Sequence, residues 1–322
     1  MRRWLDPFIV ALLCAVAVGL LVPLSSGVRS VLGGVSTGAI VVLFFLYGAR
    51  LPTGQVLAGV RNLRLQGAVL AMTFVFFPLL GLLVSTAFGP VLGNELSLGV
   101  LYLCLLPSTI QSSVVMTGIA GGNTAAAITA ATLSNVLGMA VTPVYVLLFA
   151  GVSGVASTGS PRSVLWMLLA PFLVGQLLQR LLGGWLRAHR PFTTAWDRST
   201  IVLVVLVAVS GATARGVWQL VELAHLAVLA LVSVGVLAVA LICSWWWGRG
   251  LRLPWGDRVT LLMCGSQKSL ATGMPMLAAL FPATVAGPVA VPVIVFHQLQ
   301  LLVTSVLARQ LARRRVADNP GW

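Results

Sequence analysis

Two apolar segments of the chain carry polar residues and prolines in a similar order. They read LLPSTIQSSV over residues 105–114 and LMCGSQKSL over residues 262–270, with Pro275 beyond the second. Proline removes a helix hydrogen bond, and backbone groups freed inside an apolar medium need partners from protein, water or a solute. In one segment, hydroxyls bonded to their own helix and a simple kink would suffice. Two such segments favour broken helices that surround a binding site.

The two ionisable residues deep in apolar segments are Lys268 and His297. Lys268 is the one lysine among twenty basic residues and lies about ten residues from either end of its segment, too far for its stem to reach an interface. Placing it there costs roughly 2.5–3.5 kcal/mol, so we expect a function. It either carries a coupled proton or pairs with an anionic substrate; the alternative is that it permanently donates to freed carbonyls. His297 lies one turn from Gln300 and is as compatible with a packed core histidine as with a proton carrier.

From these segments we expect a substrate or ion site with ligands on both. The candidates are Thr109, Gln111, Ser112, Ser113, Ser266, Gln267, Lys268, Ser269 and His297. Ser112, Ser113 and Gln267 are also the residues that would form a sodium site, if there is one.

The elements that position these residues follow from composition. Of 322 residues, 59% are apolar and 8% are charged, more hydrocarbon than a soluble domain of this length could bury. The runs long enough to cross a bilayer lie near 8–24, 37–51, 67–88, 98–120, 124–150, 163–182, 200–215, 226–247, 259–281 and 286–308. We predict an all-α polytopic membrane protein with ten transmembrane helices, forming one transporter unit over residues 1–322 with no soluble domain.

Charge predicts the orientation of these spans. With an even number of spans, sixteen of the nineteen arginines fall on one side, and only Arg29, Arg162 and Arg215 fall on the other. Because basic residues concentrate on the cytoplasmic side, both termini are expected to be cytoplasmic in a multi-pass protein of the cell membrane. The net charge of +14 then reflects topology and attraction to the lipid bilayer, not nucleic acid. A homodimer stays open.

The two halves of the chain share short motifs in the same order. Pro7-Phe8 recurs at Pro171-Phe172, and Gln111 and Ser113 recur at Gln267 and Ser269. Five spans per half is an odd number, so the second repeat, 162–315, would be inverted relative to the first, 1–150. Inverted repeats with broken helices 4 and 9 are typical of secondary transporters.

Several classes of chemistry have little support. The six acidic residues lie in loops, at span ends or in the tail, and the cysteines have no metal-ligand spacing. Phosphate-loop and dinucleotide motifs are absent, and elbow-like glycine-serine patterns are expected by chance among 33 glycines. We therefore expect no enzyme and no cofactor, apart from Na⁺ or H⁺ as a coupling ion. An ion channel is disfavoured because no charged ring is evident.

The chain resembles the bile acid:sodium symporter superfamily, especially the branch of sodium-bile-acid-symporter-like proteins related to the seventh member of the solute carrier ten family. The segments that carry the resemblance are FFLYGARL at 44–51, LPSTIQSS at 106–113, CGSQKS at 264–269 and FHQLQ at 296–300. The resemblance implies a four-helix panel domain (spans one, two, six and seven) facing a six-helix core domain in which spans four and nine break and cross. Substrate would bind between panel and core.

The sodium ligands of sodium-coupled relatives are poorly retained at the corresponding positions. The resemblance places Thr73 at a span-three glutamine and Ser112-Ser113 at a serine-asparagine pair. Counted from Asn123, the span-five hydroxyl positions fall on Ala127 and Ala131. The span-nine glutamate becomes Met263, and Lys268 follows the retained Gln267. Thr73 and Asn123 therefore join the candidate site by resemblance.

These observations predict a secondary active transporter of a small organic, anionic solute. We expect alternating access that is proton-coupled or sodium-independent through Lys268. Two alternatives stay open: a sodium-coupled symporter of bile-acid-like or other organic anions, and a membrane regulator of ion homeostasis without classical transport.

Overall fold

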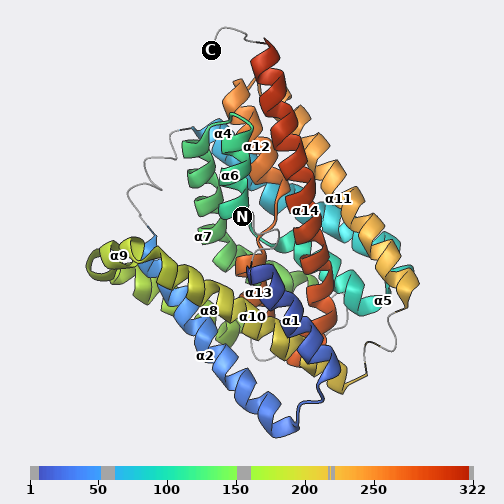
Figure 1. The fold of residues 1–322 in the computed structure, drawn as a ribbon. Helices are drawn as coiled ribbons and strands as arrows, with labels where there is room; N and C mark the ends of the chain where they lie inside the picture. The colour runs from blue at the N-terminus through green and yellow to red at the C-terminus, as the bar shows by residue number, and fades with distance from the viewer. Residues whose placement is uncertain (1–6, 52–61, 151–160, 217, 219–221, 319–322) are drawn as a thin grey trace. The chain divides into compact units, whose positions relative to one another are not determined.

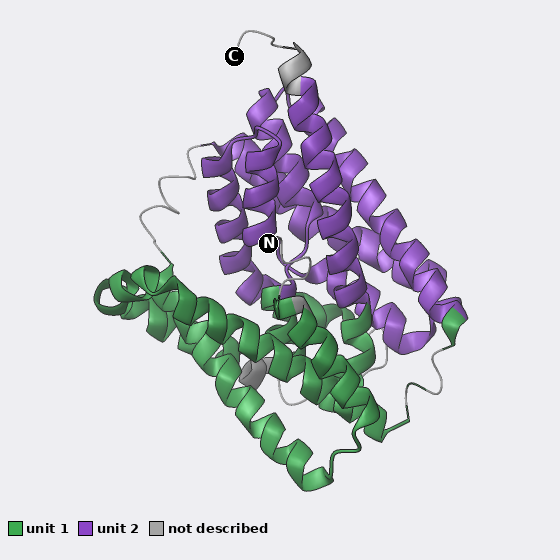
Figure 2. Cartoon of the chain, in the orientation of Figure 1, with its two compact units in different colours: residues 1–52, 143–223, 271–291 green, residues 53–142, 224–270, 292–322 purple. Residues whose placement is uncertain are grey.

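A computed structural model describes residues 7–51, 62–150, 161–216, 218 and 222–318 (Figure 1). All regular elements in these ranges are helices, as expected of an all-α membrane protein. The chain divides into two compact units, each assembled from three separate stretches (Figure 2). Unit 1 comprises residues 1–52, 143–223 and 271–291, and unit 2 comprises 53–142, 224–270 and 292–322. The predicted repeats, 1–150 and 162–315, divide the chain differently and stay a prediction.

Unit 1 is built around four packed helices and a fifth, shorter helix, α9, which continues α8 after a bend. They are α1 (Pro7–Leu21), α2 (Ser26–Arg50), α8 (Pro161–Leu177), α9 (Gln179–Ala188) and α10 (Arg190–Ala214). Helix α2 packs against α8, α9 and α10, while α1 packs against α10. Glycines permit the close crossing of α2 and α8, because a Cβ on Gly48 would lie 2.0 Å from the Phe172 carbonyl oxygen. An ion pair of 2.7 Å between Arg50 and Asp197 joins α2 to α10.

Unit 2 holds the remaining long helices and both ends of the first broken segment. They are α4 (Leu63–Ala71), the π-helix η1 (Met72–Phe76), α5 (Phe77–Leu105), α6 (Gln111–Ile119), α11 (Leu223–Gly250) and α12 (Trp255–Ser266). Helices α7 (Thr124–Ala150) and α14 (Ala283–Asp318) pass from one unit to the other at Pro143 and Pro292. Helix α13 (Leu270–Leu280) belongs to unit 1 apart from its first residue.

The predicted spans 67–88 and 98–120 meet within one helical run from Leu63 to Leu105. Gly93 interrupts this run with a φ of 74°, a left-handed conformation that glycine adopts at little cost. The chain folds back there, since the Ser97 hydroxyl donates to the Ser85 carbonyl at 2.8 Å and a Cβ on Gly81 would lie 2.6 Å from Cys104 Cβ. The run is therefore two antiparallel helices that meet at a turn, which is why a hydropathy pattern sees two spans.

Membrane-spanning capacity is established for fewer helices than the ten predicted. Among the described residues, six helices are long and apolar enough to cross a bilayer when the run Leu63–Leu105 is counted as one, and α8 with α9, bent by 91°, makes seven. Helix α1 is shorter, and the segment 259–281 is divided between α12 and α13. The stretch 183–199, which lies between the predicted spans 163–182 and 200–215, is largely helical in α9 and α10. Residues 1–6, 151–160 and 319–322, on which the predicted orientation depends, lie outside the described residues.

Candidate functional site

Two helix breaks meet inside unit 2, and we call the place where they meet the crossing. Helix α5 ends at Leu105 and α6 begins at Gln111, while α12 ends at Ser266 and α13 begins at Leu270. The amide of Ser269 in the second break donates to the Pro107 carbonyl in the first at 2.9 Å. The Ser108 hydroxyl donates to the Cys264 carbonyl at 2.6 Å. Each break therefore supplies partners for backbone groups that the other has freed.

Hydroxyls at the start of α6 bond across to the second segment instead of to their own helix. Ser112 donates to Gln267 Oε1 at 2.6 Å, and Ser113 donates to the Met263 carbonyl at 3.3 Å. Gln267 is 1% exposed, and its Nε2 has no hydrogen-bond partner among the described residues. Since a buried amide donor is costly to leave unpaired, this N–H group is available to a ligand oxygen at the crossing.

Lys268 lies within the second break and is 2% exposed. Its ammonium donates to three main-chain carbonyls: Thr73 at 3.1 Å, Cys104 at 3.0 Å and Leu106 at 2.7 Å. An ammonium has three N–H donors, so this arrangement uses all of them. The Nζ atom also lies 4.0 Å from the centroid of the Phe77 ring, where the aromatic face attracts a cation.

The three carbonyls are free because local sequence removes their usual donors. In η1 the Phe77 amide donates to the Met72 carbonyl, and the next residue, Pro78, has no N–H, so the Thr73 carbonyl lacks a helical donor. Cys104 would normally receive a bond from Ser108, whose amide instead donates to Ser134 Oγ at 3.0 Å. Leu106 lies beyond the end of α5. These carbonyls form a pocket of partial negative charge that suits a cation.

Gln300 on α14 holds the main chain of Lys268 in place. Its Oε1 accepts from the Lys268 amide, and its Nε2 donates to the Lys268 carbonyl, both at 2.8 Å. His297 Nδ1 lies 2.9 Å from the same Nε2. His297 thus contacts the crossing through Gln300. From the sequence, Gln300 was expected on the same helix face as His297 but was not among the predicted site residues.

The crossing is supported from α7 by polar residues that the sequence analysis missed. Asn135 Nδ2 donates to the Ser108 and Ala131 carbonyls at 2.5 and 2.9 Å, and Thr142 Oγ1 donates to the Leu105 carbonyl at 2.8 Å. Asn135 acts here as a donor, so its amide nitrogen and not its oxygen faces the break. The available signal was an asparagine in the middle of a helix whose other polar residues have small hydroxyl side chains.

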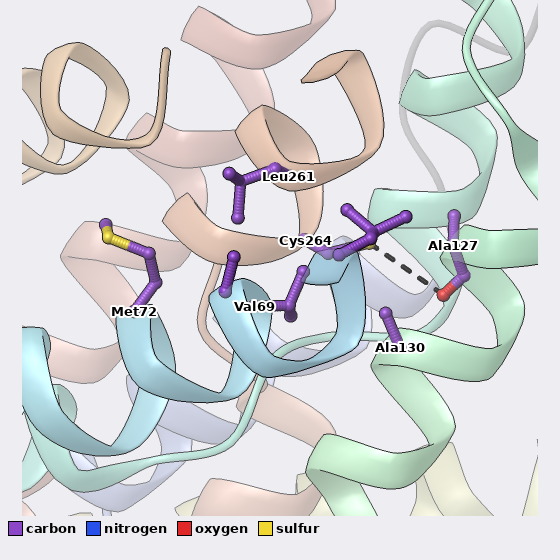
Figure 3. Close-up of a cluster of buried hydrophobic side chains, with 8 residues drawn as sticks. Val69, Met72, Ala127, Ala130, Leu261 and Cys264 are labelled. Atoms are coloured by element: carbon purple, nitrogen blue, oxygen red, sulfur yellow. Dashed lines mark hydrogen bonds between the residues drawn. The ribbon is translucent and has the colours of Figure 1, made fainter. Parts of the chain in front are cut away.

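An apolar cluster lies beside the crossing, at positions where the resemblance would imply hydroxyl ligands. It consists of Leu65, Ala68, Val69, Met72, Ala127, Ala130, Leu261 and Cys264, drawn in Figure 3. Cys264 Sγ lies 3.8 Å from the Ala127 carbonyl oxygen, and Ala131 is fully buried. Thr129, close by in sequence, donates to Ala125 on its own helix. The small residues of α7 therefore provide close packing and no hydroxyl ligands.

The other predicted site residues lie in different surroundings. Thr109 is buried within the first break, and Gln111 at the start of α6 is exposed. Ser266 donates to its own helix at Leu262, and Thr73 contributes its carbonyl, because its hydroxyl bonds to Val69.

Asn123 belongs to a separate cluster of hydrogen bonds at the start of α12. Its Nδ2 donates to Asp257 Oδ1 at 2.9 Å, and Asn62 donates to the other carboxylate oxygen at 2.6 Å. The side-chain oxygens of both asparagines accept from the first turns of α7 and α4, at Ala126 and Leu65. Asn123 therefore caps α7 and fastens α12, and the structure does not bring it to the two breaks.

Comparison with known proteins gives matches along almost the whole chain. A sequence model of the SBF-like CPA transporter family matches residues 6–313. The chain is 40% identical over 314 residues to "Uncharacterized protein PA2026" of Pseudomonas aeruginosa, covering 96% of this chain and 94% of that protein. It is 36% identical over 313 residues to "Putative symporter YfeH" of Escherichia coli, covering 97% and 94%. It is 30% identical over 276 residues to "Sodium/bile acid cotransporter 7" of Danio rerio, covering 84% and 81%.

Proposed function

The chain belongs to the SBF-like CPA transporter family, and we propose that it is a secondary active transporter of a small organic anion. It is a multi-pass membrane transport protein and not an enzyme. In this proposal the ten spans form two inverted five-helix repeats with a panel and a core, and transport proceeds by alternating access. The grouping of α1, α2, α8, α9 and α10 in unit 1 supports a panel, although α13 also falls in that unit. The two helix breaks in matching segments support the repeats.

The observation that carries the proposal is the position of the Lys268 ammonium. It occupies a pocket of three main-chain carbonyls between two broken helices, where the resemblance to sodium-coupled relatives would put a metal ion. Within the described residues no carboxylate contacts Lys268. A protonated lysine without an acidic partner favours an anion nearby, and the free N–H group of Gln267 adds a donor for it. We therefore propose that Lys268 takes the place of a coupling sodium ion.

Two modes of coupling follow from this position. In the first, Lys268 exchanges a proton as the site faces each side of the membrane and so carries the coupled H⁺. In the second, it stays protonated and pairs with the anionic substrate, and transport is then independent of sodium and of a proton gradient. No further cofactor is proposed.

Sodium coupling is the competing function, and the names of the vertebrate relatives favour it. Ser112, Ser113 and Gln267 would be its neutral ligands. Against it, Met263 supplies no carboxylate, and the Ser113 hydroxyl is engaged with the Met263 carbonyl. A regulator of ion homeostasis without transport is the remaining alternative.

Uptake into proteoliposomes tests the proposal. Radiolabelled taurocholate and a panel of smaller carboxylates and sulfonates would be offered in sodium and in choline buffer, each with and without an inward proton gradient. We expect uptake of at least one organic anion, with most of the rate retained in choline. Complete loss in choline would establish sodium coupling, and no uptake of any panel member would favour the regulator.

Variants of Lys268 separate the two coupling modes. If Lys268 carries the proton, Lys268→Gln and Lys268→Arg both lose pH-driven accumulation, because neither side chain exchanges a proton in this range. If Lys268 is a fixed cation, Lys268→Arg retains uptake. Unchanged pH dependence in Lys268→Gln would exclude Lys268 as the proton carrier and make His297 the next candidate.

A further inference from the structure

Basic and aromatic side chains gather where α11 ends and α12 begins, within unit 2. We call them the arginine-tryptophan patch: Trp245, Trp246, Arg249, Arg252, Trp255 and Arg258. The connection between the helices is short and ordered by hydrogen bonds, with Arg252 N donating to the Arg249 carbonyl and Leu253 N to the Gly248 carbonyl, both at 3.0 Å. The patch is therefore held on a tight turn at the end of a helix long enough to cross a membrane.

The guanidinium of Arg258 is fixed by aromatic contacts. Its Cζ lies 4.0 Å from the ring centroid of Trp245 and 5.4 Å from that of Trp255. The two indoles meet edge to face, 5.7 Å apart. The stem of Arg258 packs on Gly248, where a Cβ would lie 2.7 Å from Arg258 Cγ. Arg258 is thus positioned before any ligand arrives, which lowers the entropic cost of binding.

The positive charges of the patch lack an acidic partner. Arg249 lies over Trp246, with its Cζ 5.6 Å from the ring centroid. Asp257 is next to Arg258 in sequence, but its two oxygens accept from Asn62 and Asn123. The Arg50–Asp197 ion pair lies in the other unit, and within the described residues no carboxylate pairs with an arginine of the patch. The patch therefore presents cations whose neutralisation must come from outside the protein.

Two buried N–H donors in the patch also lack acceptors. They are Arg258 Nε and Trp255 Nε1, and neither has a hydrogen-bond partner among the residues that the structure describes. A group that brings several oxygen acceptors and negative charge would satisfy both needs, because guanidinium groups bind phosphate through paired N–H donors. Phosphate is the chemistry that this combination of donors recognises.

We propose that the arginine-tryptophan patch binds the phosphate group of an anionic phospholipid. The lipid is favoured over a free phosphate ion because the patch terminates the apolar helix α11 and because tryptophan concentrates at the level of lipid headgroups. Basic clusters beside membrane helices bind anionic lipids on the same principle. The site is separate from the Lys268 crossing, so it does not depend on the proposed transport function.

Native mass spectrometry of the full-length protein in detergent tests this inference. The probes are dioleoylphosphatidylglycerol, dioleoylphosphatidylcholine and inorganic phosphate. We expect the phosphatidylglycerol to bind more tightly than the phosphatidylcholine. Each arginine contributes about fivefold to attraction by anionic lipid, so Arg258→Gln should weaken phosphatidylglycerol binding about fivefold or more.

Matched variants separate a specific site from general attraction between charges. Arg180→Gln removes one positive charge at an exposed position on α9 and should bind phosphatidylglycerol like the wild type. Trp255→Phe retains an aromatic ring but removes the Nε1–H donor, and it should weaken binding without unfolding the protein. Equal weakening in Arg180→Gln, or wild-type affinity in both Arg258→Gln and Trp255→Phe, would overturn the inference. Binding of inorganic phosphate that depends on Arg258 and displaces the lipid would reassign the patch to a soluble anion.

Discussion

Replacing Lys268 by alanine should convert the pocket of three carbonyls into a sodium site. The side chain now places an ammonium against the carbonyls of Thr73, Cys104 and Leu106. Alanine removes the ammonium and its stem but leaves the three oxygens in place, since each is freed by its own backbone environment. Neutral oxygens of this kind are suitable ligands for a hard cation, so we expect Na⁺ to stabilise the variant and not the wild type.

The magnitude follows from the hydrogen bonds that are lost. A buried acceptor left without a donor costs about 1–3 kcal/mol, and relief of a buried charge offsets part of that cost. Taking the low end for three carbonyls, Lys268→Ala should lose about 3 kcal/mol in choline buffer. A sodium dissociation constant of about 10 mM would then restore about 1.6 kcal/mol at about 150 mM Na⁺. For a chain of this size that restoration corresponds to a rise in Tm of about 3 °C.

The assay is thermal unfolding of purified protein in matched sodium and choline buffers. Lys268→Met is the control, because its unbranched apolar side chain fills much of the same space and leaves no room for an ion. We expect a sodium-dependent rise in Tm for Lys268→Ala alone. Equal sodium dependence in the wild type, or none in Lys268→Ala, would refute the view that Lys268 occupies a cation site.

Two further predictions concern packing and topology. Gly48→Ala should lower the free energy of unfolding by about 1–3 kcal/mol in chemical unfolding, because its Cβ would lie 2.0 Å from the Phe172 carbonyl oxygen. The control, Gly38→Ala on the same helix, meets nothing within 4 Å and should raise the free energy of unfolding by about 0.5–1 kcal/mol. Similar losses of stability in both variants would contradict the close packing of α2 on α8. In a cysteine-free background, Ser25→Cys should react with a membrane-impermeant maleimide added to whole cells and His189→Cys only after permeabilisation, and the reverse pattern would overturn the predicted orientation.

The sequence predicted the helix breaks because their causes are local. Pro107 and the hydroxyls after it indicate the end of α5, and the polar run at Gln267 indicates the end of α12. It was less informative about length and number of spans. Gly93 was not recognised as the turn between two antiparallel helices. Most of α9 lies between two predicted spans and was not predicted as a helix, because short polar helices leave a weak hydropathy signal.

The partners of Lys268 could not be predicted from residue types, because they are main-chain atoms. The sequence analysis did raise the alternative that Lys268 donates to freed carbonyls, but it could not say which ones. Pro78 does indicate that the Thr73 carbonyl is free, because proline has no N–H to donate to it. This holds only in the π-helical hydrogen-bond register that tertiary packing selects. Thr73 therefore contributes its carbonyl instead of the hydroxyl that the resemblance suggested.

The residues around Lys268 fit the proposal that this side chain takes the place of a coupling cation. The resemblance would place a carboxylate at residue 263 and a hydroxyl at residue 127. Here Met263 lies in an apolar cluster, and Ala127 has only a methyl side chain and contacts Cys264 through its carbonyl oxygen. An acidic residue beside the ammonium would neutralise the charge that an anionic substrate requires. Under the proposed function, a lysine at residue 268 is therefore better matched with a neutral residue than with an acid at residue 263, because a buried ion pair between them would leave no charge for an anion.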